Sequence, residues 1–311
     1  DIDIFNKITK GGLPRKSMTV LLATTGGGKS LIKCHMAANH LMYGKNVLYI
    51  TMEMAEEEIG RRIDANIMDI TMDEVNEIPR DVYDKRLARY KTKTTGKLII
   101  KEYPTGSVHS GHFRHLLNEL EMKKNFKPDV IFLDYLNICA SSRVRGAAAA
   151  SSYNLVKSIA EEVRGLAMEY NYAVVTSSQF NRDGYGNSDV DLTNTSESMG
   201  ITHTADCILG LVTSEQLDEL GQLMLKQLKN RWGDLGYYRR FLVGIDRAKM
   251  KIYELEESAQ NNVNLDEGSG GGSGKKMKSY DDDGPVFDKT DIGMRLKGKR
   301  KGQVFSDAQL T

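Results

Sequence analysis

MTVLLATTGGGKS, residues 18–30, is an apolar run followed by a glycine-rich turn that ends in Gly28-Lys29-Ser30. The next segment, LIKCHMAANHLMYG (31–44), has apolar residues at helical spacing. A strand, a glycine-rich turn and a helix in this order match the phosphate-binding loop G-x-x-x-x-G-K-[ST], except that Ala23 replaces the first glycine. Alanine is tolerated wherever φ is negative, so we expect the half of the loop that contacts phosphate to be intact.

This loop predicts a site for a nucleoside triphosphate, ATP or GTP, together with Mg²⁺. Backbone N–H groups of the glycine run and of the helix N-terminus would surround the phosphates. Lys29 would reach the outer phosphates and Ser30 would ligate the metal. The predicted nucleotide-binding residues are Thr25, Gly26, Gly27, Gly28, Lys29, Ser30 and Leu31.

The rest of the pattern predicts an α/β fold with a central, largely parallel sheet flanked by helices, because short apolar runs alternate with segments of helical period. Strands are expected at 18–24, 46–52, 97–103, 130–136, 173–179 and 207–212, and helices near Lys29, Ala55, Asp81, His109 and Ser152. After residue 220, LMLKQLKNR, YYRRFLVGID and KIYELE predict an antiparallel C-terminal meander. Polar segments 140–151 and 180–196 each follow a strand and are long enough to be functional loops.

Composition favours a soluble, cytoplasmic protein. The chain has 311 residues, of which 40% are hydrophobic and 27% charged. It lacks the run of roughly 18 apolar residues that a membrane span needs, and its polar first residues do not form a secretory signal. Cys34, Cys139 and Cys207 lie in or beside apolar segments without metal-ligand spacing, so we expect three buried thiols.

The C-terminal part differs in composition from the rest. GSGGGSG (268–274) is typical of an engineered flexible linker. We therefore expect an ATPase domain over 1–258, a linker over 259–274 and a charged segment over 275–311 that does not fold alone. That segment is either the chain's own tail or a tethered peptide from a partner protein, and we favour the second. The whole chain has a formal net charge of +1, and this segment alone, with nine Lys or Arg and six Asp, contributes +3. Residues 1–274 are therefore slightly acidic, and any nucleic acid would bind to a local basic patch.

Three polar residues at the ends of predicted strands could complete a hydrolase site. Asp134 in VIFLDYL has the position of an acid that supports the metal. Glu53, after NVLYITM, is the candidate general base, although an acid at the start of a helix is also favoured by the helix dipole. Gln179, at the end of AVVTSSQ, could sense the outer phosphate.

Together these segments resemble the RecA-type core of the DnaB family of hexameric replicative helicases, and among its members those of T-even bacteriophages. The resemblance covers roughly residues 1–256. It is carried by ITKGGLPRKSMTVLLATTGGGKS, NVLYITMEMAEEEIGRRIDANI, VIFLDYLNIC, SSQFNR and TSESMGITHTADCILGLV.

The resemblance implies an ATP-dependent motor that hydrolyses nucleotide at subunit interfaces and moves 5′ to 3′ on single-stranded DNA, in the host cytoplasm if the protein is phage-encoded. It implies a hexameric ring for the full-length protein and a primase or helicase-loader partner, which 275–311 could represent. Lys229 and Arg231 in KQLKNRWGDLG would act on the nucleotide of the neighbouring subunit. The residues expected to contact DNA are Arg143, Arg145, Asn181, Arg182, Glu197, Ser198 and Gly200.

Two alternative functions remain open at this point. A RecA-like recombinase shares the loop and the sheet but forms open filaments; SSQFNR, SESMG and the predicted strand that carries both Lys229 and Arg231 on one face favour the helicase. A nucleotide-regulated scaffold would hydrolyse nucleotide only incidentally, and the presence of Glu53 beside a complete metal site argues against it.

Overall fold

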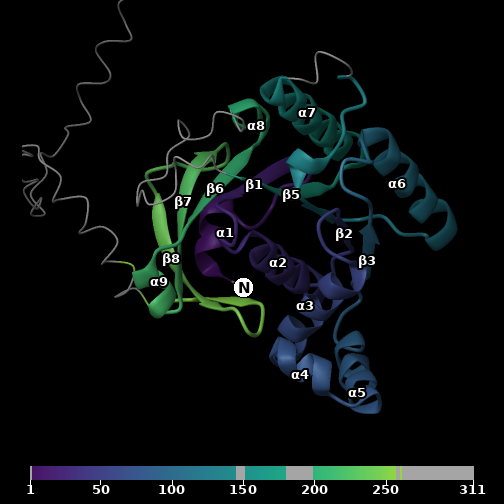
Figure 1. Ribbon diagram of the computed structural model, residues 1–311, viewed down its shortest axis with the longest axis vertical. Coiled ribbons are helices and arrows are strands. Elements are labelled where there is room, and N and C mark those ends of the chain that lie inside the picture. The colour runs from purple at the N-terminus through teal and green to yellow at the C-terminus, as the bar shows by residue number, and fades with distance from the viewer. Residues whose placement is uncertain (1, 145–150, 180–198, 257–259, 261–311) are drawn as a thin grey trace, which may run out of the picture. The chain divides into compact units, whose positions relative to one another are not determined.

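A computed structural model of the chain describes residues 2–144, 151–179, 199–256 and 260 (Figure 1). These residues belong to a compact unit, Asp1–Asp266, and the remaining segment, Glu267–Thr311, lies outside the described residues. The expected domain limit at 258, the linker and the charged segment therefore stay predictions.

A single sheet runs through the described part of the chain in the order β3-β2-β4-β5-β1-β6-β7-β8-β9. Strands β3 to β6 in this order are parallel, and β7, β8 and β9 are antiparallel to their neighbours. The strands are Ser17–Ala23 (β1), Val47–Thr51 (β2), Leu98–Glu102 (β3), Val130–Asp134 (β4), Ala173–Gln179 (β5), Cys207–Val212 (β6), Gln222–Asn230 (β7), Arg240–Asp246 (β8) and Lys251–Glu254 (β9). The predicted fold class, a parallel sheet with an antiparallel C-terminal meander, is confirmed.

Helices cover both faces of the sheet (Figure 1). They are Asp3–Thr9 (α1), Lys29–Met42 (α2), Glu56–Met68 (α3), Met72–Glu77 (α4), Arg80–Lys91 (α5), Ser110–Lys124 (α6), Ser152–Tyr170 (α7), Met199–Thr204 (α8) and Glu215–Glu219 (α9), with a 3₁₀ turn at Leu136–Ile138. The side chains of β1 alternate between the two layers: Met18, Val20 and Leu22 share a buried cluster with α6 and α7, and Leu21 and Ala23 share another with α2 and α3. Because both faces are covered, β1 is buried at every position, which explains its uninterrupted apolar sequence.

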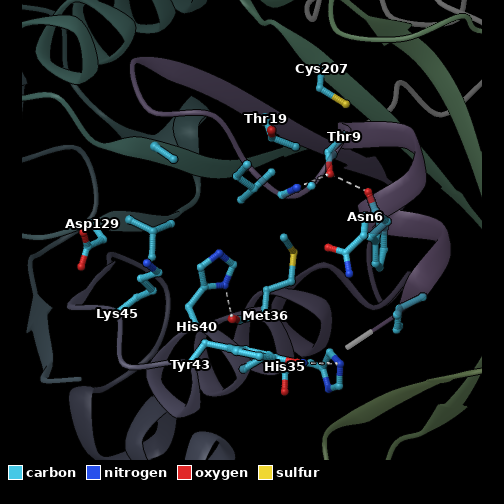
Figure 2. A pocket seen from close by; sticks show the side chains of 18 of the residues that line it. Asn6, Thr9, Thr19, His35, Met36, His40, Tyr43, Lys45, Asp129 and Cys207 are labelled. Carbon is cyan, nitrogen blue, oxygen red and sulfur yellow. Dashed lines mark hydrogen bonds between the residues drawn. The ribbon is translucent and has the colours of Figure 1, made fainter. Parts of the chain in front are cut away.

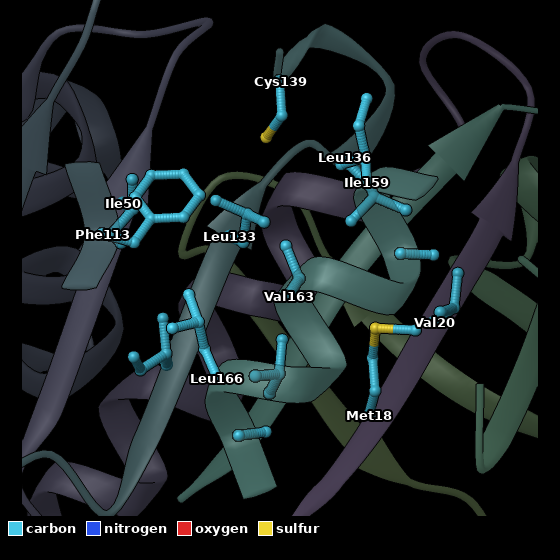
Figure 3. Packing of buried hydrophobic residues seen from close by; sticks show 14 of the residues in the cluster. Met18, Val20, Ile50, Phe113, Leu133, Leu136, Cys139, Ile159, Val163 and Leu166 are labelled. Atoms are coloured by element: carbon cyan, nitrogen blue, oxygen red, sulfur yellow. The ribbon is translucent and has the colours of Figure 1, made fainter. Parts of the chain in front are cut away.

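The cluster beneath α7 holds the sheet and the helix layer together. Figure 3 shows Ile159, Val163 and Leu166 of α7 lying over Met18 of β1 and Leu133 of β4. All of these side chains are at most 5% exposed. At roughly 25 cal/mol per Å² of apolar surface removed from water, such burial is the main source of stability for the scaffold that carries the strand ends.

The register places the ends of four strands along one edge of the sheet. Ala23 at the end of β1 pairs with Gln179 at the end of β5, and Thr51 at the end of β2 pairs with Asp134 at the end of β4. Ligands of open parallel α/β sheets bind at this carboxyl edge. The antiparallel β7 runs the other way, so that its last residue, Asn230, pairs with Cys207 at the amino end of β6.

Two smaller differences from the sequence-based expectation have local causes. The strand expected at 130–136 ends at Asp134, because Leu136 begins the 3₁₀ turn. The run YYRRFLVGID begins as a turn rather than a strand, since Tyr238 has a φ of 52° and the Gln227 amide donates to the carbonyls of Tyr237 and Tyr238.

The three cysteines are buried and form no disulfide, as predicted. Burial raises the pKa of the Cys34 thiol to about 12, which keeps it protonated and unreactive near neutral pH. Within the described ranges, no helix has the length and apolar character needed to cross a bilayer.

Candidate nucleotide-binding site

The glycine-rich loop between β1 and α2 adopts a backbone that its sequence requires. Gly26 and Gly28 have φ values of 77° and 87°, in the left-handed region where glycine is favoured, and Gly28 is the N-cap of α2. Ala23 ends β1, and it is not among the described residues with positive φ. A Cβ added at Gly27 would lie 2.9 Å from the Cβ of Ala23, so the alanine methyl occupies space that the glycine leaves free.

Lys29 opens α2 and folds back over the loop. Its Nζ donates to the carbonyl oxygens of Thr24 at 2.7 Å and Ala23 at 3.1 Å. Burial, followed by the charge of Lys33, lowers the pKa of Lys29 to about 8, and the carboxylates of Glu53 and Asp134 partly oppose this shift. Both acids therefore lie within electrostatic reach of the amine that is predicted to hold the outer phosphates.

Asp134 ends β4 at the centre of the site and is 1% exposed. Its Oδ2 accepts from the Ser30 hydroxyl at 2.9 Å and from the Tyr49 hydroxyl at 3.1 Å, and its Oδ1 accepts from the Lys33 ammonium. Burial alone would raise the pKa of Asp134, but Lys33 and the two hydroxyls lower it below its usual range. The carboxylate is therefore ionised in the folded protein.

The donors around Asp134 fit Mg²⁺. A hydroxyl and an ionised carboxylate are hard oxygen donors, and Mg²⁺ commonly binds through one or two such groups together with waters and substrate phosphates. In the part of the chain that the structure describes, no three His, Cys, Asp or Glu side chains gather as a separate metal cage. The site thus suits an ion that depends on phosphate oxygens for the rest of its coordination.

Glu53 and Gln179 occupy the same edge of the sheet. Glu53 is exposed and lies two residues beyond the end of β2, whereas α3 begins at Glu56 with Ala55 as its N-cap. The acids that complement the dipole of α3 are therefore Glu56 and its two successors, which favours the interpretation of Glu53 as a base. Gln179 is the last residue of β5, beside the glycine-rich loop.

Three polar side chains of the site were not singled out from the sequence: Lys33, Tyr49 and Ser177. Lys33 follows Lys29 by four residues and Ser30 by three, so it shares their face of α2, and helical spacing alone could have indicated it. Tyr49 and Ser177 lie in β2 and β5, in runs that resemble ordinary buried strand sequence. Their hydrogen bonds depend on strand order, which local sequence does not contain.

Lys229 and Arg231 lie at the amino edge of the parallel strands, away from the glycine-rich loop of their own chain. Lys229 is in β7 and its Nζ donates to the carbonyl of Thr202 at 2.5 Å. Arg231 is not part of β7 but follows it directly, and its Nη1 lies 2.9 Å from Oδ1 of Asp206. Both side chains reach the segment 202–206 and so face the same side, although only Lys229 lies in the strand that was expected to carry both.

Among the residues expected to contact DNA, Arg143 and Gly200 can be located. Arg143 is exposed, with its Nη1 3.7 Å from a carboxylate oxygen of Glu161. Gly200 is buried in α8, where an added Cβ would come within 2.7 Å of the Cβ of Lys157, so glycine is needed for the close packing of α8 on α7. Those outside the described residues remain predictions: Arg145, Asn181, Arg182, Glu197 and Ser198.

The first of the two long loops is fixed to α7 where it begins. Glu162 is 5% exposed and accepts from the hydroxyls of Ser110, Ser141 and Ser142 and from the Ser142 N–H. Burial would raise the pKa of Glu162, but these hydrogen bonds outweigh it and lower the pKa to about 2. The ionised carboxylate thus anchors the backbone that leads directly to Arg143.

A cavity of about 620 Å³ lies elsewhere, between α1, α2 and the amino ends of the strands. Figure 2 shows Thr19 and Cys207 of the sheet together with Met36 and His40 of α2 in its wall. None of the predicted nucleotide-binding or catalytic residues lines it. The cavity is therefore distinct from the candidate site at the carboxyl edge.

Most of the chain matches a known family. Residues 2–242 match the model of the DnaB-like helicase C-terminal domain. The chain is 43% identical over 259 residues to a DnaB-like replicative helicase of Enterobacteria phage T4, covering 82% of this chain and 54% of the phage protein. It is 27% identical over 233 residues to a probable plasmid replicative DNA helicase of Chlamydia psittaci, covering 72% of this chain and 49% of the relative. The chain thus spans about half the length of these relatives.

Solved structures share the fold. A DnaB-like replicative helicase, studied with its interactions with primase, matches 82% of this chain and 61% of its own with a TM-score of 0.68 and 17% identity. A second solved structure, of an isolated ATPase domain, matches 82% of this chain and 90% of its own with the same TM-score and 16% identity. At these identities the likeness concerns the architecture, which agrees with the RecA-type core expected from the sequence.

Proposed function

Because this chain belongs to the DnaB-like helicase C-terminal domain family, we propose that it is the motor domain of a replicative DNA helicase. In this proposal it hydrolyses ATP or GTP with Mg²⁺ at subunit boundaries and moves 5′ to 3′ along single-stranded DNA. The chain spans about half of its relatives, so activity, partners and assembly are proposed for the protein of which it forms the motor.

One observation carries the proposal. The hydrogen bond of 2.9 Å between Ser30 and Asp134 joins the glycine-rich loop to the end of a second strand, beside Lys29. An ordinary glycine turn would not require an ionised, almost fully buried carboxylate at this position. A phosphate-bound metal does require one.

Different residues of the site have different roles in the proposed hydrolysis. The backbone N–H groups of residues 25–31 and the Lys29 ammonium bind and orient the phosphates, while Ser30 and Asp134 would hold Mg²⁺. When bound, the metal neutralises charge on the phosphates. Glu53 takes the proton of the attacking water, as its exposed position at the mouth of the site allows. Gln179, at the root of the second long loop, would link the outer phosphate to DNA binding.

The positions of Lys229 and Arg231 support hydrolysis between subunits. These residues lie at one edge of the sheet and the glycine-rich loop lies at the other. In the head-to-tail ring proposed here, Lys229 and Arg231 of one subunit would face the glycine-rich loop of its neighbour. An arginine supplied across such a boundary stabilises the charge of the transition state and can contribute about 10³–10⁵ in rate.

The DNA-binding part of the proposal concerns the two loops that follow β4 and β5. Arg143, Arg145, Asn181 and Arg182 would contact the backbone of single-stranded DNA, with N–H groups near Glu197, Ser198 and Gly200. Backbone contacts suit a motor that moves on any sequence. A primase or helicase loader would be the partner protein, and residues 275–311 could be a peptide from it.

The test is hydrolysis stimulated by single-stranded DNA. Replacing Glu53 with Gln should reduce the stimulated rate by at least about a hundredfold while leaving nucleotide binding within a few-fold, because the general base is lost and the phosphate ligands remain. Glu57→Gln removes the same charge from an exposed position in the first turn of α3 and serves as the matched control. Full activity of Glu53→Gln would refute its role, and an absence of DNA stimulation in the unmodified protein would favour a nucleotide-regulated scaffold. The family match does not favour the recombinase alternative.

A further inference from the structure

Lys33 is a charged residue at the nucleotide site to which hydrolysis, as proposed above, assigns no role. It lies in α2 with a side chain that is 0% exposed. Its Nζ donates to Oδ1 of Asp134 and, at 2.8 Å, to the hydroxyl of Ser177 in β5. A lysine buried without a partner would be strongly destabilising. The ammonium of Lys33 is instead paired with Asp134 of β4 and hydrogen-bonded to Ser177 of β5.

The pairing changes the charge that a metal ion would encounter. Asp134 accepts from Lys33 on one oxygen, and from Ser30 and Tyr49 on the other. The carboxylate is thus neutralised and hydrogen-bonded by the protein alone. A divalent cation that approaches without nucleotide meets a neutral ion pair and the like charge of Lys33, instead of a free carboxylate.

We propose that Lys33 is a positioning residue that acts as a built-in counter-cation for Asp134, so that the divalent metal binds only together with the phosphates of the nucleotide. The proposal rests on the function proposed above for this site. Phosphate oxygens restore the negative charge that Lys33 cancels, and the ion pair keeps Asp134 oriented toward Ser30 when metal is absent. Lys33 thereby sets the affinity of the site for the metal ion, and it need not touch the nucleotide.

The ion pair also connects two strands of the site. Ser177 precedes Gln179 by two residues on β5, so Lys33 joins the strand of Asp134 to the strand that carries the proposed phosphate sensor. Any movement of the carboxylate toward a bound metal would act on Lys33 and, through it, on Ser177. Lys33 therefore links metal binding at Asp134 to β5.

The test uses Mn²⁺ as the probe and measures its binding by electron paramagnetic resonance, with and without a nonhydrolysable nucleotide. In the unmodified protein, nucleotide should strengthen Mn²⁺ binding by at least about a hundredfold. Lys33→Met removes the charge but keeps most of the side-chain volume, and should increase the affinity for Mn²⁺ without nucleotide by at least about tenfold. Lys123→Met is the matched control, because it makes the same substitution at an exposed lysine that pairs with Glu119 in α6, outside the site; its Mn²⁺ affinity should change less than about threefold.

Other outcomes separate this proposal from the function on which it rests. An unchanged affinity of Lys33→Met for Mn²⁺ alone, in a variant with native circular dichroism, overturns the role of Lys33. If Lys33→Met does not fold, Lys33→Gln makes the same charge change with a polar side chain. Tight Mn²⁺ binding to the unmodified protein without nucleotide overturns the proposal independently of any variant. Failure to bind nucleotide at all would instead contradict the proposed hydrolase site.

Discussion

At the end of β1, the methyl group of Ala23 fills the space that a side chain at position 27 would need. The Ala23 methyl would lie 2.9 Å from a Cβ at position 27, and the Thr24 carbonyl would lie 3.1 Å from it. Neither contact involves the flexible end of a long side chain, so the loop would have to move. The loop therefore accommodates Ala23, in place of the first glycine of the pattern, because position 27 is a glycine.

This relation predicts the behaviour of two substitutions in the loop. Gly27→Ala should weaken nucleotide binding by about 5- to 150-fold, because overpacking of this kind costs about 1–3 kcal/mol. Combined with Ala23→Gly, which removes the competing methyl, it should recover part of the loss. Fluorescence titration with a labelled nucleotide measures both, and Ala23→Gly alone serves as the control with near-normal affinity. Equal losses in the single and double variants would show that the two positions do not interact.

Residues of the site differ in how far the sequence predicts them. Lys29, Ser30, Asp134 and Gln179 stand at the ends of recognisable strands or in a known loop pattern, and the register brings those strand ends together as expected. Helical spacing places Lys33 on the face of α2 that carries Lys29 and Ser30, but its partners, Asp134 of β4 and Ser177 of β5, are brought to it only by the strand order of the folded sheet. Local sequence contains no information on that order.

At the scale of elements, α7 serves both as a core helix and as the anchor of a loop. Val163 and Leu166 pack on the sheet, while Glu162, between them and the loop, is buried among serine hydroxyls. Ordinary apolar periodicity predicted the helix. The polar contacts on its buried side were not predicted, because a Glu in a helix is usually solvated.

Replacing Glu162 with Gln should lower stability by about 1–3 kcal/mol at neutral pH, since one of the two acceptor oxygens becomes an amide NH₂ donor and the buried hydroxyls that donated to it lose their acceptor. Because the folded pKa of Glu162 is about 2, below its ordinary value of 4.5, its stabilisation is complete above pH 4.5 and is lost as the pH falls toward 2. Chemical denaturation at several pH values should therefore show a difference between variant and unmodified protein that shrinks over this range. Glu161→Gln changes the adjacent, exposed acid and should have little effect at any pH. A difference that stays constant from about pH 7 to about pH 3 would contradict the anchoring role.

Elements that local sequence predicted poorly are short or depend on distant contacts. Helices α1, α4 and α9 have five to seven residues, below the length at which helical period becomes distinct. The start of α4 is positioned partly from far along the chain, as the Met72 N–H donates to the carbonyl of Ala248. The long buried strands and helices were predicted within one or two residues because both faces of the sheet demand continuous apolar sequence.

For the whole molecule, the two ends of the parallel strands carry different parts of the proposed site. The loop that is proposed to hold nucleotide lies at the carboxyl edge, and Arg231, paired with Asp206, lies at the amino edge. One chain cannot bring the two together without rearranging its sheet. A closed ring of head-to-tail subunits would bring them together at every boundary.

Mixing of two inactive variants tests this arrangement. Lys29→Ala should abolish phosphate binding, and Arg231→Ala should leave binding intact but reduce hydrolysis by at least about a hundredfold. In mixed rings, an intact loop from an Arg231→Ala chain can meet an intact Arg231 from a Lys29→Ala chain, which in random assembly occurs at about a quarter of the boundaries at equal mixing. DNA-stimulated hydrolysis should therefore reappear and peak near equal proportions, with light scattering confirming that rings form with nucleotide and oligo-dT. A chain that carries both substitutions, mixed with Arg231→Ala, restores no boundary and is the control. Assembled rings without any recovery would place the function of Arg231 within its own subunit, bound to Asp206.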